Sequence, residues 1–130
     1  MTASSRALEL VQTAALAADA KQAEDLVALD VTGPLQLTDV FLLATGRNER
    51  NVLAIADEVE DRMIAAGAKP LRREGRTEGR WVLIDFGDVV VHVQHAEDRV
   101  YYALERLWKD CPVIPIEAAV VTSTPGDVVS

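Results

Sequence analysis

The segment from Gly79 to Trp108, GRWVLIDFGDVVVHVQHAEDRVYYALERLW, constrains the fold of this chain more than any other. Two runs of β-branched and aromatic residues flank Gly87-Asp88, a dipeptide that favours the two-residue turn of a β-hairpin. A helical pattern follows from about residue 97 to residue 109. The sequence therefore predicts a β-hairpin that leads into a helix.

Pairing across the predicted turn gives the hairpin two faces that differ in polarity. One face is wholly apolar and predicts core, and its cross-strand pairs are Val82–Val93, Ile84–Val91 and Phe86–Val89. The other face is mixed, and its pairs are Trp81–Gln94, Leu83–His92 and Asp85–Val90. A mixed face that carries a tryptophan is more typical of an interface than of a core. We therefore expect a contact surface around Trp81.

The rest of the chain predicts two more helices and three more strands. The helices are expected at 5–19 and 48–66, and the strands at 26–31, at 40–45 and, as an edge piece, at 69–73. The first two strands are apolar on both faces apart from Asp30, which is typical of central strands. At 130 residues the chain predicts one α/β domain, a mixed sheet of about five strands packed with three helices. We expect the domain to span 1–112 and the tail at 113–130 to be poorly ordered.

Composition limits the classes of function. A net charge of −8 disfavours autonomous binding to nucleic acid. Residues 69–80 nevertheless hold five basic side chains against two acidic ones, which is typical either of a solvated loop or of a contact with an acidic or RNA surface. The single cysteine, Cys111, rules out an internal disulfide and fits a reducing compartment. We expect no signal peptide, and no window approaches the ~18 apolar residues of a membrane span.

Five blocks of the sequence resemble a known family. They are ALDV at 28–31, TDVFLLATG at 38–46, VLAIADEV at 52–59, WVLIDFGDVVVHV at 81–93 and RVYYALERLW at 99–108. In this order they resemble the Iojap family, the bacterial ribosomal silencing factors, over residues 6–112. Two positions depart from the family pattern, because Gln94 stands where an aromatic residue or methionine is usual and Val40 where an aromatic residue is usual.

The resemblance implies a fold similar to the nucleotidyltransferase palm, but a binding protein rather than an enzyme. Members bind an interface protein of the large ribosomal subunit, protein fourteen, and so block joining of the small subunit and repress translation under nutrient limitation. The resemblance also implies a cytoplasmic protein that forms a homodimer when free. A role in assembly of the large subunit is the alternative, and a secondary ribosomal RNA contact by residues 69–80 is possible in either case.

Six residues are expected to form the partner-binding surface: Trp81, Tyr102, His92, Arg73, Glu74 and Arg99. Tyr102 lies 200° around the helix from Val100, which we expect in a core stripe with Leu104, Leu107 and Trp108, so it should face away from the core beside Arg99. It also matches the tyrosine of the family's R-x-x-Y-x-L-E pattern. The alternative is an incidental exposed tyrosine. Arg73 and Glu74 are expected near the Trp81 face, and His92 is expected as a hydrogen-bonding surface histidine rather than a metal ligand.

Three aspartates near strand ends, Asp39, Asp85 and Asp88, suggest an alternative, a metal-dependent nucleotidyltransferase. That chemistry needs a Gly-Ser turn and two aspartates at i, i+2 on one strand. No Gly-Ser dipeptide occurs in the sequence, and a turn separates Asp85 from Asp88. We therefore expect turn roles for these aspartates and no catalytic residue, metal or cofactor.

Overall fold

The computed structural model describes residues 2–35, 37–102 and 104–116, without the side chains of residues 101, 102, 105 and 107. Its helices are α1 (Ser5–Ala20), α2 (Glu49–Ala65), α3 (Ala96–Tyr102) and α4 (Leu104–Leu107). Its strands are β1 (Glu24–Asp30), β2 (Val40–Gly46), β3 (Arg72–Glu74), β4 (Trp81–Asp85), β5 (Val89–His95) and β6 (Val113–Ile114).

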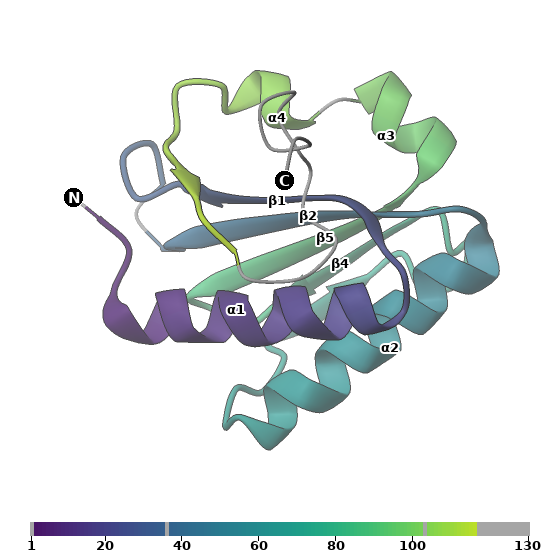
Figure 1. Ribbon diagram of the computed structural model, residues 1–130, viewed down its shortest axis with the longest axis horizontal. Helices are drawn as coiled ribbons and strands as arrows, with labels where there is room; N and C mark the ends of the chain where they lie inside the picture. Colours follow the sequence, from purple (N-terminus) through teal and green to yellow (C-terminus); the bar gives the residue numbers. More distant parts are fainter. Residues whose placement is uncertain (1, 36, 103, 117–130) are drawn as a thin grey trace, which may run out of the picture.

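The strands form one mixed sheet in the order β3-β4-β5-β2-β1-β6. The β2–β5 pair is parallel, and the other neighbouring pairs are antiparallel. Helices α1 and α2 lie against one face of the sheet, whereas α3 and α4 lie over the other (Figure 1). The predicted α/β fold is confirmed, with six strands in place of about five because β6 adds to the edge of β1.

The hairpin has the predicted register. Trp81 lies opposite Gln94, Leu83 opposite His92, and Val82 opposite Val93. The Phe86 N–H donates to the Val89 carbonyl at 2.9 Å and closes the turn. Gly87 adopts a φ of 91°, a left-handed conformation that glycine reaches without steric cost.

The apolar face of the hairpin packs against α1 and α2 and forms the main core. The buried apolar stripe of α2 consists of Val52, Ile55, Ala56, Val59 and Met63. Helix α1 packs closely through small side chains, since five of its alanines are fully buried: Ala7, Ala14, Ala15, Ala17 and Ala18. Leu8 of the same helix is exposed.

A second, smaller core lies on the mixed face. Its buried residues are Leu29, Val31, Leu43 and Leu104, and Phe41, Trp81, Trp108 and Cys111 pack against it half-buried. This cluster holds the chain around α4 against β1 and β2. Both β1 and β2 are therefore central strands, as predicted, and core residues lie on both of their faces.

The region after β5 differs from the predicted single helix at 97–109. The described residues form α3 and α4 on either side of residue 103. Val100, expected in the core stripe, is 83% exposed, so the predicted orientation of this helix is wrong. Strand β6 begins at residue 113, inside the expected tail, and residues 117–130 lie outside the described residues. The domain boundary at 112 stays a prediction.

None of the described helices has the length and hydrophobicity to cross a membrane.

Candidate protein-binding surface

Trp81 is the aromatic anchor of the mixed face. It is the first residue of β4, lies opposite Gln94 and is half-buried. Its indole N–H donates to Nδ1 of His92 on the neighbouring strand at 3.2 Å, and the two ring centroids are 6.3 Å apart. A side chain held by its neighbour loses less conformational entropy on binding. The indole is therefore oriented before any partner arrives.

His92 is buried beside the indole, so the prediction of a surface histidine is wrong, although the expected hydrogen bonding is present in its contact with Trp81. Its ring meets Phe41 edge-on with centroids 5.0 Å apart, and Phe41 in turn meets Trp108 at 5.4 Å. Burial lowers the pKa of His92 to about 4. The ring is therefore neutral at neutral pH, and because Nδ1 accepts a hydrogen bond, Nε2 carries the proton.

A shallow hollow of about 310 Å³ lies beside the indole and is lined by Glu74, Gly75, Trp81 and Leu83. We call these four residues the Trp81 surface. Glu74 lies opposite Leu83 across β3 and β4, which puts its side chain on the same face as the indole. A Cβ on Gly75 would lie 1.9 Å from the Trp81 carbonyl oxygen, so the chain approaches β4 very closely there. This close contact fixes Glu74 relative to Trp81.

Two predicted site residues lie elsewhere. Arg73 is opposite Ile84 and hence on the α2 side of the sheet, where its guanidinium donates to both carboxylate oxygens of Glu60 at 2.7 and 2.8 Å. Arg99 is only 6% exposed and donates to the Thr45 hydroxyl at 2.8 Å, so its expected place on an exposed helix face is wrong.

The side chain of Tyr102 lies outside the described part of the chain, so its role stays a prediction. Of the six predicted residues, the structure brings Trp81, His92 and Glu74 together. Sequence reasoning missed Arg72, which lies opposite Asp85 on the mixed face and pairs with Glu74 at 3.3 Å. The strict alternation of β3 could have indicated it, because Arg72 and Glu74 are two apart.

The basic segment at 69–80 is largely neutralised within the molecule. Arg73 pairs with Glu60, and Arg76 pairs with Asp57, both on α2. Arg80 pairs with Glu49, Glu97 and Asp98, and the hydrogen bonds that its guanidinium donates to Asp98 and Glu97 raise its pKa. Paired arginines on a protein of net charge −8 offer little to RNA, so the expected RNA contact loses support.

Two of the three aspartates that suggested a transferase accept hydrogen bonds from the backbone. Asp39 Oδ2 accepts the Ser4 N–H at 2.8 Å, and Asp85 Oδ1 accepts the Gly87 N–H at 2.8 Å within the hairpin turn. Among the described residues, no group of three or more His, Cys, Asp or Glu side chains could hold a metal ion. The turn role expected for Asp85 is confirmed.

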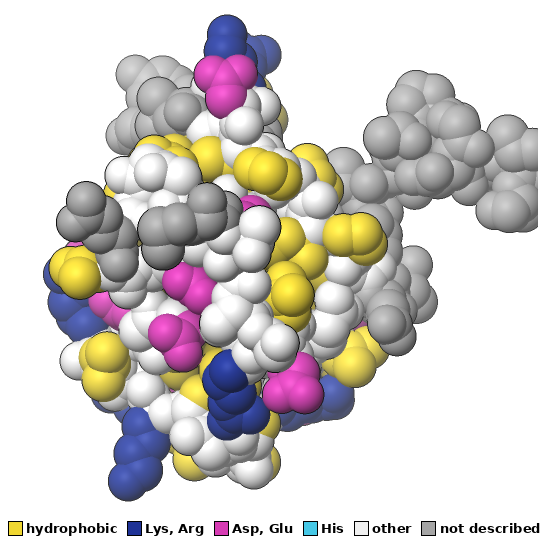
Figure 2. Space-filling view, turned by 90° about the vertical axis from the view of Figure 1, so that its left-hand side faces the viewer, with side chains coloured by type: hydrophobic (Ala, Val, Ile, Leu, Met, Phe, Trp, Pro, Cys, Tyr) yellow, Lys and Arg dark blue, Asp and Glu magenta, His cyan; other side chains and the backbone are white. Residues whose placement is uncertain are grey.

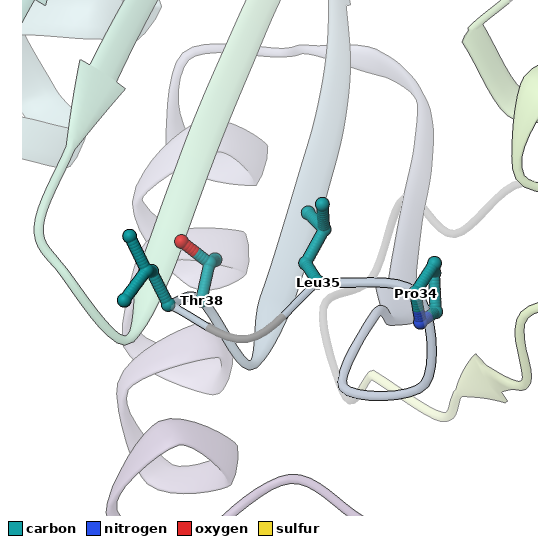
Figure 3. Close-up of a pocket in the computed structure, with 4 residues that line it drawn as sticks. Pro34, Leu35 and Thr38 are labelled. Carbon is teal, nitrogen blue, oxygen red and sulfur yellow. The ribbon is translucent and has the colours of Figure 1, made fainter.

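A second hollow, of about 370 Å³, lies at the loop between β1 and β2 and is lined by Pro34, Leu35, Leu37 and Thr38 (Figure 3). None of its four lining residues is titratable, and Leu37 is 92% exposed. Figure 2 views this end of the molecule, where hydrophobic, acidic and basic side chains are intermixed. This end offers contact area but no concentrated charge.

The chain is thus a small α/β domain with a half-buried tryptophan beside a shallow hollow on one face of its sheet. Comparison with known proteins gives the family. The family described as "Ribosomal silencing factor during starvation", RsfS, matches residues 4–127. The chain therefore belongs to the RsfS family of ribosomal silencing factors, and the resemblance inferred from the sequence blocks is confirmed.

Individual relatives agree with this assignment. The Ribosomal silencing factor RsfS of Bacillus subtilis is 44% identical over 108 residues, which cover 83% of this chain and 92% of that protein. A crystal structure of a Bacillus halodurans protein superposes with a TM-score of 0.74 at 45% identity and covers 83% of this chain and 98% of that one. A more distant mouse relative, "Mitochondrial assembly of ribosomal large subunit protein 1", is 28% identical over 91 residues, 68% of this chain and 40% of that protein. The bacterial relatives' names describe regulation rather than catalysis.

Proposed function

We propose that this protein binds the large ribosomal subunit through the Trp81 surface and sterically blocks joining of the small subunit, which represses translation under nutrient limitation. The docking partner is the interface protein numbered fourteen. The mechanism needs no turnover and no cofactor, because a 14.1 kDa domain seated on the interface occupies space that the small subunit requires. The protein acts in the cytoplasm, where the ribosomes are.

The observation that carries the proposal is the half-exposed indole of Trp81, oriented by His92 and bordered by a hollow. Buried aromatic anchors, tryptophan above all, dominate the binding energy of protein interfaces, and truncating one costs about 2 kcal/mol or more. Family membership supplies the ribosomal partner. The homodimer expected for the free protein would cover the same apolar surface, and it stays a prediction.

Cosedimentation with isolated large and small subunits tests the proposal. The parent protein should pellet with large subunits only, and Trp81→Ala should weaken this binding about thirtyfold, the equivalent of 2 kcal/mol. Leu37→Ala is the matched control, since it removes an exposed apolar side chain from the other hollow.

Circular dichroism and thermal melting establish that each variant is folded, and Leu83→Asp provides a second lesion in the same hollow. If Trp81→Ala and Leu83→Asp are folded and bind like the parent, the Trp81 surface is not the docking site. If the parent pellets with neither subunit, the ribosomal function itself is refuted.

Assembly of the large subunit is the second candidate, and the name of the mouse relative favours it. Removal of the protein from growing cells should distinguish the two roles. A silencing factor predicts normal large subunits and excess joined ribosomes during starvation. An assembly factor predicts large-subunit precursors that accumulate even in rich medium.

A further inference from the structure

The hollow beside Trp81 combines an apolar wall with a carboxylate at its rim. Leu83 and the indole lie two residues apart on β4, and Glu74 lies opposite Leu83 on β3, so all three side chains share one face. Gly75 then passes so close to the Trp81 carbonyl that no Cβ fits between them. The carboxylate and the ring therefore hold a fixed relation across the hollow.

Glu74 is available to a partner. Its side chain is 59% exposed, and the ion pair described for it is with Arg72, which is 60% exposed, at 3.3 Å. Such solvated pairs contribute less than ~1 kcal/mol, so exchanging Arg72 for an outside cation costs little. The nearby Arg73 and Arg80 are engaged on α2 and α3 and face other carboxylates.

We propose that the hollow binds one basic side chain, arginine in preference to lysine, supplied by the protein partner on the ribosome. This inference rests on the proposed function and specifies the chemistry of its contact. The aliphatic stem would pack on Leu83, the planar guanidinium would stack on the indole of Trp81, and its N–H groups would reach Glu74. The net charge of −8 favours approach of a cationic partner.

A charge-reversal pair provides the sharpest test. Glu74→Lys should weaken binding to large subunits about tenfold or more, because it repels the incoming cation. Glu78→Lys makes the same change in net charge at an exposed position that does not line the hollow. The affinity of this variant for large subunits should stay within about threefold of the parent's. Equal weakening by both variants would mean general electrostatics and would overturn the proposal.

Arg72 gives a test in the opposite direction. It competes with the partner's cation for Glu74, so Arg72→Ala should bind large subunits more tightly than the parent. Lys69→Ala removes the same charge from an exposed position in the same segment and provides the control. If Arg72→Ala binds no more tightly than Lys69→Ala, Glu74 does not receive the partner's cation.

A small probe tests the site without the ribosome. N-acetyl-arginine amide at millimolar concentrations should shift the Trp81 indole N–H resonance, whereas the neutral isostere N-acetyl-citrulline amide should not, and Glu74→Lys should abolish the arginine effect. Equal shifts from both compounds, or none, would overturn the inference.

The two proposals fail separately. If Trp81→Ala abolishes subunit binding while Glu74→Lys binds like the parent, docking through the Trp81 surface is supported and the cation site is refuted. If the parent pellets with neither subunit but the arginine probe still shifts the Trp81 indole N–H resonance selectively, the cation site is supported and the ribosomal partner is refuted.

Discussion

Neighbouring residues on β3 show how register decides a side chain's role. Arg72 and Glu74 lie on the Trp81 side of the sheet, while Arg73 lies opposite Ile84 and pairs with Glu60 on α2. The sequence shows that these three residues alternate, but it does not show which neighbours they face. A shift of one residue exchanges the two faces. Only the pairing with β4 makes Glu74, rather than Arg73, part of the surface.

Gly75 is the residue on which the Trp81 surface depends most directly. Gly75→Ala should destabilise the fold by about 2 kcal/mol or more, because its φ is +87° and the new Cβ would lie 1.9 Å from the Trp81 carbonyl oxygen. Gly33→Ala is the control, since nothing lies within 4 Å of its added Cβ. Urea unfolding of both variants measures the difference. Equal stabilities would refute the close approach of this loop to β4.

At the scale of elements, α3 shows where helical periodicity is insufficient. Hydrophobicity placed Val100 inward and Arg99 outward, but Val100 is 83% exposed and Arg99 is buried. Arg99 reaches Thr45 at the end of β2, and Arg80 pairs with Asp98 and Glu97 in the first turn of α3. These polar contacts orient the helix on the sheet. A seven-residue helix buries too little apolar surface for hydrophobicity alone to decide its rotation.

Arg99→Ala should therefore loosen α3 rather than remove a partner contact. We expect a loss of about 1–3 kcal/mol in the free energy of unfolding, because Thr45 loses a buried charged donor. Hydrogen exchange should accelerate in α3. Arg106→Ala, at an exposed position in α4, should leave exchange in α3 unchanged. If Arg99→Ala keeps the parent's stability and exchange but binds subunits weakly, Arg99 is a contact residue after all.

At the scale of the whole molecule, the mixed face is divided between core and surface. Its β5 part is buried, as His92 and Gln94 show, while Trp81 and Leu83 on β4 remain half-exposed. The hairpin sequence predicted a single contact surface. Of the described chain, α3 and α4 lie over this face of the sheet (Figure 1), and the residues around α4 pack against β1 and β2.

The buried His92 links global stability to pH. Its folded pKa of about 4 lies below the ordinary value of 6.5, so between these values the unfolded chain binds more protons than the folded one. The stabilisation is complete above pH 6.5 and is lost as pH falls towards 4. Lowering the pH from 7.5 to 5 should therefore reduce the free energy of unfolding by about 2 kcal/mol.

Urea unfolding of the parent and of His92→Phe across this range provides the measurement. Phenylalanine keeps the ring against Phe41 but cannot titrate, so the variant should lack this part of the pH dependence. Parallel curves for the two proteins would contradict the burial of a neutral His92.

The sequence alone determined the elements of this protein up to the end of β5, the register of the hairpin and the family, but not the division into α3 and α4 or the presence of β6. These features follow from local causes: alternation along strands, the 3.6-residue period of α2, and a Gly-Asp turn that fixes which residues pair. The tertiary structure decided which residues act together. Whether Arg73 or Arg72 accompanies Glu74, whether His92 is exposed, and which side of α3 faces the sheet all depend on contacts between segments far apart in the chain. Local patterns carry no information about such contacts, so the Trp81 surface became defined only when β3, β4 and β5 came together.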